Sequence, residues 1–188
     1  MNTIIKQNGI NFGLILGFLL ILPTLLGYAV NISILVSYWT LAYVLATVII
    51  VGIITIAFTK KGLGGFINFR NAFSAYFIML VVSSLISSFM NFALFNVVDK
   101  DFTEVVKEKQ IESVNGQRDW VMNKMGDAPV EKIDEMDAKF DEAIEKIKLD
   151  DPYSLISIIK GFAIFVSIFS IFGLLLSLIL KKKDPALE

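Results

Sequence analysis

Four carboxylates form the first group in the sequence that could do chemistry. Asp99 and Asp101 stand at the start of an acidic segment, and Asp150 and Asp151 stand at its end. If the two ends of this segment are neighbours, their oxygen atoms suit a hard cation such as Ca²⁺ or Mg²⁺. The sequence lacks the spacing of a calcium-binding loop, however, and acidic residues also cap helices. We therefore favour capping and solvation over a metal site.

The residue types that are missing exclude several kinds of chemistry. The chain of 188 residues contains no cysteine and no histidine, which excludes disulfides, zinc sites built on these residues and Ser-His-Asp triads. Loop carboxylates and Lys160 are the groups left for acid–base catalysis. We therefore expect no enzymatic activity and no cofactor, and the few basic residues between the apolar segments give no support to nucleic-acid binding.

Small and polar residues recur along three apolar segments. They are Gly9, Gly13 and Gly17 in the first, Ser83, Ser84, Ser87, Ser88 and Asn91 in the third, and Ser167, Ser170, Gly173 and Ser177 in the fourth. Small residues four apart let helices approach closely in lipid. We predict that these faces pack the helices together. The alternative is that the serine and asparagine faces line a polar path for a solute.

These residues lie within or beside three stretches of the chain that contain no charged residue. The stretches cover residues 7–59, 71–98 and 161–180 of a chain that is 55% hydrophobic, with a mean hydropathy of +0.69. Because a helix needs about 20 apolar residues to cross a bilayer, the first stretch is long enough for two crossings. The sequence predicts an all-α fold with four transmembrane helices, at about Ile10–Val30, Ile34–Phe58, Asn71–Val97 and Leu155–Leu180. The first apolar run is too long for the core of a signal peptide, so we expect it to remain.

The distribution of charge predicts the orientation. Basic residues flank the predicted helices on one side, namely Lys6, Lys60, Lys61, Arg70 and the cluster 181–183. The other side has the uncharged turn 31–37 and the segment 99–151, which holds every acidic residue except Asp184 and Glu188. Since cytoplasmic loops are rich in Lys and Arg, we predict that both termini are cytoplasmic and that the acidic segment is extracytoplasmic.

The insertion 99–151 is predicted to form a helical hairpin between the third and fourth membrane helices. After Pro129, apolar residues recur at helical spacing, at Ile133, Met136, Phe140, Ala143 and Ile147. The first half is less regular, with breaks near Asn115-Gly116 and Gly126, and Asp127 is a candidate cap for the second helix. The chain thus divides into residues 1–98, which hold helices 1–3 and the cytoplasmic loop 59–70, the insertion 99–151, and residues 152–188, which hold helix 4 and a basic tail.

Two interpretations of this hairpin remain open. In the first, its two apolar seams bury each other and its charges form a solvated surface. In the second, an apolar strip with Trp120, Val121 and Met125, together with Phe140, docks an envelope protein or a second copy of the chain. Two heptads bury little area, so a partner would help to stabilise the hairpin.

Basic residues also mark the membrane interface. Lys60, Lys61 and Arg70 border a turn with aromatic residues, which suits a segment lying under anionic lipid headgroups. Lys160 lies within the predicted fourth helix, where an ionisable residue is a functional candidate. Its long side chain can reach the interface, so we predict an interfacial lysine rather than a buried functional charge.

One short motif carries a resemblance to a known family. After two hydrophobic helices and a basic turn, residues 64–69 read GGFINF, and Ala72-Phe73 opens the next helix. Together with the charged insertion and the terminal lysines, this motif resembles the DUF4199 family. The resemblance implies a multi-pass protein in the inner membrane of Bacteroidota-type bacteria, with no established activity and no catalytic residues. It also implies a family-2 glycosyltransferase as a partner.

Two functions follow from these observations. The first is that of a non-catalytic accessory or scaffold subunit that binds an envelope protein, supported by the missing Cys and His, the lack of intramembrane acids and the hairpin. The alternative is a small transporter or lipid-handling protein that uses the polar face of helices 3 and 4. A closed bundle with no cavity between these two helices would exclude the alternative.

Overall fold

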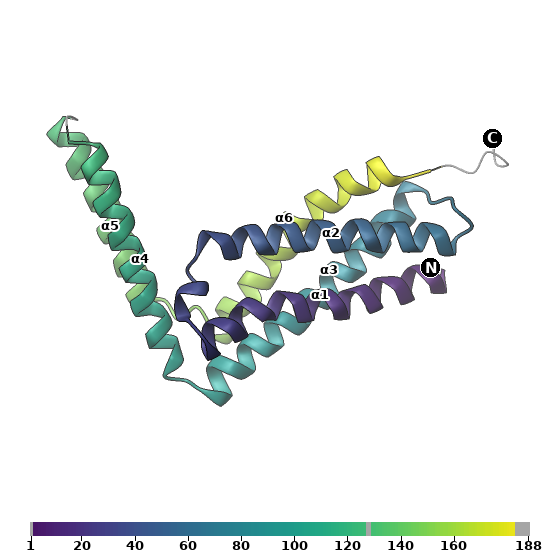
Figure 1. Ribbon diagram of the computed structural model, residues 1–188, viewed down its shortest axis with the longest axis horizontal. Coiled ribbons are helices and arrows are strands. Elements are labelled where there is room, and N and C mark those ends of the chain that lie inside the picture. The colour runs from purple at the N-terminus through teal and green to yellow at the C-terminus, as the bar shows by residue number, and fades with distance from the viewer. Residues whose placement is uncertain (1, 127–128, 183–188) are drawn as a thin grey trace.

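The computed structural model in Figure 1 describes residues 2–126 and 129–182. These residues form helices and no strand beyond one isolated bridge, so the predicted all-α class is confirmed. The elements are α1 (Thr3–Ala29), the 3₁₀ helix η1 (Ile32–Ile34), α2 (Tyr38–Gly62), α3 (Phe69–Ala93), the π-helical turn η2 (Leu94–Val98), α4 (Phe102–Lys124), α5 (Val130–Leu149) and α6 (Leu155–Leu180).

Among the described residues, four helices are long and apolar enough to cross a membrane, as the sequence predicts. They are α1, α2, α6, and α3 together with η2. Three helix starts differ from the prediction, and the smallest difference is in α3, which begins at Phe69 instead of Asn71. The Asn2 side chain caps α1, which therefore begins at Thr3. The predicted start of the second span at Ile34 is wrong, because the chain first forms η1 and the Ser37 hydroxyl then caps α2.

Glycines hold α1 against α3. Along this contact Gly9 faces Ile78, Gly13 faces Val82 and Gly17 faces Ile86. A Cβ atom added to Gly13 would lie 2.7 Å from the Val82 Cβ, far inside normal contact distance. The close approach that the glycine spacing predicts is therefore confirmed for these two helices.

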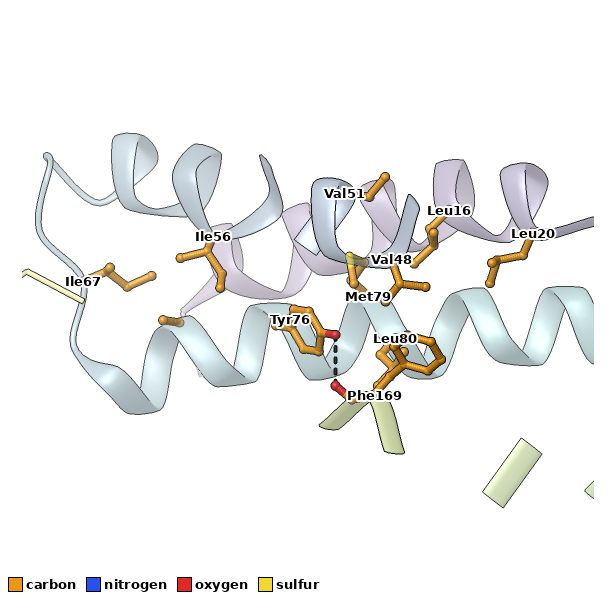
Figure 2. Packing of buried hydrophobic residues seen from close by; sticks show 11 residues of the cluster. Leu16, Leu20, Val48, Val51, Ile56, Ile67, Tyr76, Met79, Leu80 and Phe169 are labelled. Atoms are coloured by element: carbon orange, nitrogen blue, oxygen red, sulfur yellow. Dashed lines mark hydrogen bonds between the residues drawn. The ribbon is translucent and has the colours of Figure 1, made fainter. Parts of the chain in front are cut away.

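A fully buried tyrosine fastens α6 to the other apolar helices. The Tyr76 ring of α3 lies between Gly52 of α2 and Gly173 of α6, where added Cβ atoms would lie 2.5 Å and 2.3 Å from ring carbons. Its hydroxyl donates to the Phe169 carbonyl of α6 at 3.0 Å (Figure 2). Because lipid offers no competing hydrogen bonds, this contact fixes the depth at which α6 crosses α3.

The turn between α2 and α3 is tied to the end of α6. Gly64 and Gly65 have φ angles of 83° and 91°, which suit glycine because it has no Cβ. Ile67 and Lys182 exchange two backbone hydrogen bonds, of 2.9 Å and 2.8 Å, and Asn68 caps α3. The motif that carries the family resemblance therefore closes the end of the bundle where the N-terminus also lies (Figure 1). We call this the terminal end.

At the opposite end, α4 and α5 lie side by side and project away from the four apolar helices (Figure 1). We call this the α4/α5 end. Arg118 of α4 bridges the two helices, with guanidinium-to-carboxylate distances of 2.6 Å to Asp137 and 2.8 Å to Asp141 of α5. The hydrogen bond to Asp137 raises the pKa of Arg118 above its ordinary value.

The first helix of this pair is longer than the sequence predicts. α4 runs without interruption to Lys124, so the break predicted at Asn115-Gly116 is wrong. A glycine inside a helix costs about 1 kcal/mol relative to alanine, which the contacts of α4 with α5 offset. The predicted turn near Gly126 does follow α4, whereas the predicted cap Asp127 lies outside the described residues.

Stacked aromatic rings join α4 to the apolar bundle. Phe95, which is 2% exposed, stacks on Tyr153 and on Phe102, with ring centroids 3.4 Å and 5.6 Å away. Tyr28 of α1 meets the Phe102 ring edge-to-face at 4.8 Å, and its hydroxyl donates to Asp99 Oδ2 at 3.2 Å. This cluster fixes both the point where α4 leaves the bundle and the point where the chain returns into α6.

Candidate functional site

A cavity of about 320 Å³ lies between α3 and α6 toward the α4/α5 end. Its walls are the second half of α3, the first half of α6 and the Pro152-Tyr153 segment, with Leu20 of α1 and Val44 of α2 at its base. The buried residues of α6, which are Phe169, Gly173 and Ser177, all lie in its second half. The first half of α6 therefore stands apart from the bundle and leaves the cavity, whose volume is at the lower end for small-molecule pockets.

The α3 wall of the cavity is polar. It consists of Ser84, Ser87, Ser88 and Asn91. None of these side chains forms a hydrogen bond with a described residue, whereas the neighbouring Ser83 hydroxyl donates to the Leu80 carbonyl. Ser84 is only 4% exposed, so its hydroxyl faces the cavity without a protein partner. Because an unpaired polar group in the hydrocarbon region is costly, this wall favours a bound polar group.

Residues of η2 contact Tyr153 on the side away from the cavity and stabilise this wall. Asn96, which lies in this π-helical turn, donates from Nδ2 to the Tyr153 carbonyl at 2.8 Å, while Phe95 stacks on the Tyr153 ring. Burial raises the pKa of Tyr153 to about 12, so its phenol is neutral at physiological pH. Single π-helical turns are common at functional sites. The cavity therefore has a rigid, uncharged side as well as a polar one.

The cavity ends inside the bundle. All of its α3 residues lie at Ser84 or further along the helix, and the contact of Tyr76 with Phe169 and Gly173 closes the space between α3 and α6 below them. A space that is closed at one end has room for a ligand but forms no continuous path through the bundle. The arrangement thus supports binding rather than a continuous channel.

A second cavity of about 320 Å³ differs in its chemistry. It lies between α1, η1 and α2 and has three hydroxyl groups, all of them already bonded. Ser37 caps α2, Thr40 donates to the Ile34 carbonyl, and Tyr43 donates to the Leu19 carbonyl at 3.0 Å, which Pro23 leaves without its helical partner. This cavity has room for apolar chains but offers no free polar group, so the α3/α6 cavity is the better candidate site.

The four residues predicted to bind a partner do not form one exposed surface. Trp120 is 65% exposed on α4, whereas Val121 and Met125 are half-buried. Phe140 is also half-buried, as are the other members of its predicted stripe, Ile133, Met136, Ala143 and Ile147. The exposed residues between them mark the opposite face of α5, which places the stripe on the side of α4.

The basic residues predicted at the membrane interface lie near the surface of the bundle. Lys61, Arg70 and Lys160 are exposed, and Lys160 is not among the residues that line the cavity. Lys60 is half-buried, and its Nζ atom donates to the Leu180 carbonyl at 3.2 Å. Lys60 therefore stabilises the end of α6, where free carbonyls favour a positive charge. Sequence reasoning did not anticipate this contact.

The four carboxylates at the α4/α5 end do not gather around one point. Asp99 Oδ1 accepts the Phe102 backbone N–H at 3.1 Å at the start of α4, and Asp151 Oδ1 accepts the Tyr153 backbone N–H at 2.9 Å. Within residues 2–126 and 129–182, no group of three or more Asp or Glu side chains is close enough to hold a metal ion. Asp99 and Asp151 act instead as caps of the turns that flank the α4/α5 pair.

The cavity includes residues that the sequence pattern did not single out as a site. The serine and asparagine face of α3 was recognised, because polar residues are conspicuous in an apolar segment. The sequence pattern does not single out Tyr153, which lines the cavity, or Asn96, which supports it through a hydrogen bond to its carbonyl. The sequence feature that could have identified them is Pro152-Tyr153 directly before the fourth membrane span, together with Asn96 close to the end of the third span.

One of three comparisons with known proteins gives a match for this chain. Neither the comparison with curated proteins nor the comparison with solved structures found a match. The family model of DUF4199, described as a protein of unknown function, matches residues 11–182 and thus all of the apolar helices except the first turns of α1. With this match over most of its length, the chain belongs to the DUF4199 family of proteins of unknown function.

Proposed function

We propose that this membrane protein is a lipid-handling protein that binds an amphiphilic molecule in the α3/α6 cavity. The observation that carries the proposal is Ser84, a residue that is only 4% exposed and lines the cavity, and whose hydroxyl has no hydrogen-bond partner among the described residues. The polar α3 wall suits a polar head, and the rings of Phe162 and Phe165 on α6 suit an apolar chain. Such an arrangement of a mostly apolar pocket with a few convergent polar groups is typical of ligand sites.

Filling the cavity tests this proposal. Gly161 lines the cavity, and a Cβ atom added to it meets nothing within 4 Å, so Gly161→Leu adds bulk at the cavity wall without a clash. We expect this variant to fold and to retain at least tenfold less co-purified lipid than the native protein, measured by native mass spectrometry in mild detergent. Ala163→Leu is the matched control, because Ala163 is exposed on the same helix and does not line the cavity. Equal lipid retention in both variants would contradict the proposal.

The orientation that we propose places the α4/α5 end, and with it the nearer end of the cavity, on the extracytoplasmic side of a bacterial inner membrane. Its support is the excess of Lys and Arg at the terminal end. Because the chain has no cysteine, single cysteines report accessibility without background. We expect cysteines at Ser113 and Asn123 to react with an impermeant maleimide in spheroplasts, and a cysteine at Leu63 to react only after the membrane is opened. The reverse pattern would refute the orientation.

A second function, that of an accessory or scaffold subunit, rests on Trp120. This large side chain is 65% exposed on α4, and tryptophan is enriched at the residues that dominate protein docking. The partner that the family resemblance suggests is a family-2 glycosyltransferase, and a second copy of the chain is the alternative. Docking and lipid binding are compatible, because Trp120 is far along α4 from the cavity.

Two substitutions separate docking from folding in the α4/α5 pair. Phe140→Asp puts a charge into the half-buried contact between α4 and α5, which we expect to cost about 2–4 kcal/mol and to make the pair sensitive to protease. Trp120→Ala removes an exposed ring, so protease resistance should not change while co-purification of a partner falls. If Trp120→Ala leaves co-purification intact, the docking role of Trp120 is wrong.

A further inference from the structure

We infer that the α3/α6 cavity takes an amphiphile whose head is uncharged and carries hydroxyl or ester oxygens, as a diacylglycerol does. The inference rests on the proposed function and names its ligand class. Its basis is the chemistry of the cavity lining. The lining contains hydroxyl and amide groups, and none of the lining residues that the structure describes is charged.

The lining matches a neutral polar head. Serine hydroxyls both donate and accept, and an asparagine amide offers two donors and an acceptor. Ser84, Ser87, Ser88 and Asn91 can therefore bond both the hydroxyl and the ester carbonyls of a glycerol ester. These groups follow one face of α3 over seven residues, or about 10 Å along the helix axis. A ligand would bond them in sequence as it extends from the interface toward Ser84.

A phosphate in the same position would lack a counter-charge. Burying an ionised group without a partner is far more costly than burying a hydrogen-bonded neutral one. Lys160 is the only basic residue within the first half of α6, and it is exposed and does not line the cavity. In every glycerophospholipid the phosphate is attached directly to the glycerol, so burial of the glycerol esters would bring the phosphate against this uncharged wall.

Charges of both signs adjoin the cavity lining in sequence, because Lys160 directly precedes Gly161 on α6 whereas two aspartates precede Pro152. Asp151 directly precedes the lining residues Pro152 and Tyr153, and its carboxylate accepts the Tyr153 backbone N–H. Asp150 is exposed beside it. Like charges repel more strongly near a membrane surface than in bulk water, because the effective dielectric constant is lower. An anionic headgroup that enters past this turn, rather than beside Lys160, would therefore be disfavoured both by the uncharged lining and by the aspartates.

Lipids with identical acyl chains and different headgroups test the proposed ligand class. The full-length protein is titrated in detergent with 1,2-dioleoylglycerol, dioleoyl phosphatidic acid or dioleoyl phosphatidylethanolamine, and bound lipid is counted by native mass spectrometry. We expect at least tenfold tighter binding of dioleoylglycerol than of either phospholipid, and we expect Gly161→Leu to abolish the difference while Ala163→Leu preserves it. Ser88→Lys supplies the missing cation, so this variant should gain affinity for phosphatidic acid specifically.

The outcomes distinguish the proposed ligand class from the proposed lipid-binding function. If a phospholipid binds as tightly as dioleoylglycerol and is lost in Gly161→Leu, the ligand class is wrong and the proposed lipid-binding function stands. If no lipid binds differently to the native protein and to Gly161→Leu, the proposed function itself fails, and the cavity holds only water. Tight binding of dioleoylglycerol alone, lost in Gly161→Leu, supports both.

Discussion

Replacing Gly173 by leucine should separate α6 from the rest of the bundle. A Cβ atom at this position would lie 2.3 Å from the Tyr76 ring, which is itself fully buried against Gly52. Because a buried ring between two helices cannot move aside, α6 must shift, and the hydrogen bond from Tyr76 to the Phe169 carbonyl should break. Overpacking typically costs 1–3 kcal/mol, and the lost bond adds about 1 kcal/mol. We expect a total loss of about 3 kcal/mol in unfolding by dodecyl sulfate in mixed micelles.

Gly161→Leu is the control for this experiment, since it places the same side chain on the same helix in open space. It should unfold at nearly the same dodecyl sulfate fraction as the native protein. If both leucine variants lose equal stability, the contact of Tyr76 with Gly173 is not what holds α6, and the description of the cavity's closed end is wrong as well.

Replacing Phe95 by alanine should loosen the α4/α5 pair from the bundle. Phe95 is nearly fully buried and stacks on both Tyr153 and Phe102. Phe→Ala substitutions at such positions cost about 3–5 kcal/mol, and here the loss falls on the junction rather than on the apolar helices. We expect spin labels at Asn115 of α4 and Leu41 of α2 to give a much broader distance distribution by double electron–electron resonance, while the four apolar helices stay folded.

Phe89→Ala serves as the matched control for the junction. Phe89 lies on α3, shortly before η2, but it is 69% exposed and faces away from the protein interior. Its removal should leave the distance distribution unchanged. An equally narrow distribution in Phe95→Ala would show that the aromatic cluster does not set the direction of α4. Because Tyr153 lines the cavity, Phe95→Ala should also weaken lipid retention, which Phe89→Ala should not.

The membrane spans could be predicted because they depend on local composition. Charge-free runs of sufficient length identify all four apolar helices among the described residues, and the glycine spacing in α1 identifies its contact with α3. The helix ends were less accurate. The start of α2 at Tyr38 depends on capping by Ser37 and on the short helix η1, and such local competition between caps does not show in hydropathy.

The cavity could be predicted only in part, because one of its walls arises from tertiary packing. The polar face of α3 is visible in the sequence, whereas its separation from α6 follows from where Tyr76 fastens that helix. The Tyr153 wall likewise depends on a π-helical turn and on ring stacking between segments distant in the chain. The break predicted at Asn115-Gly116 failed for the same reason, since the contact with α5 through Arg118 outweighs the low helix propensity of glycine.

The most direct test of the central claim is photo-crosslinking in the native membrane. The photoreactive residue p-benzoylphenylalanine is placed at Phe165, which lines the α3/α6 cavity, or at Ile168, which is 50% exposed on α6 and does not line it. After irradiation, the lipid attached at each position is identified by mass spectrometry. A cavity that binds a specific amphiphile predicts one dominant adduct at position 165 and a mixture at position 168 that follows the bulk lipid composition. The same mixture at both positions would contradict the account.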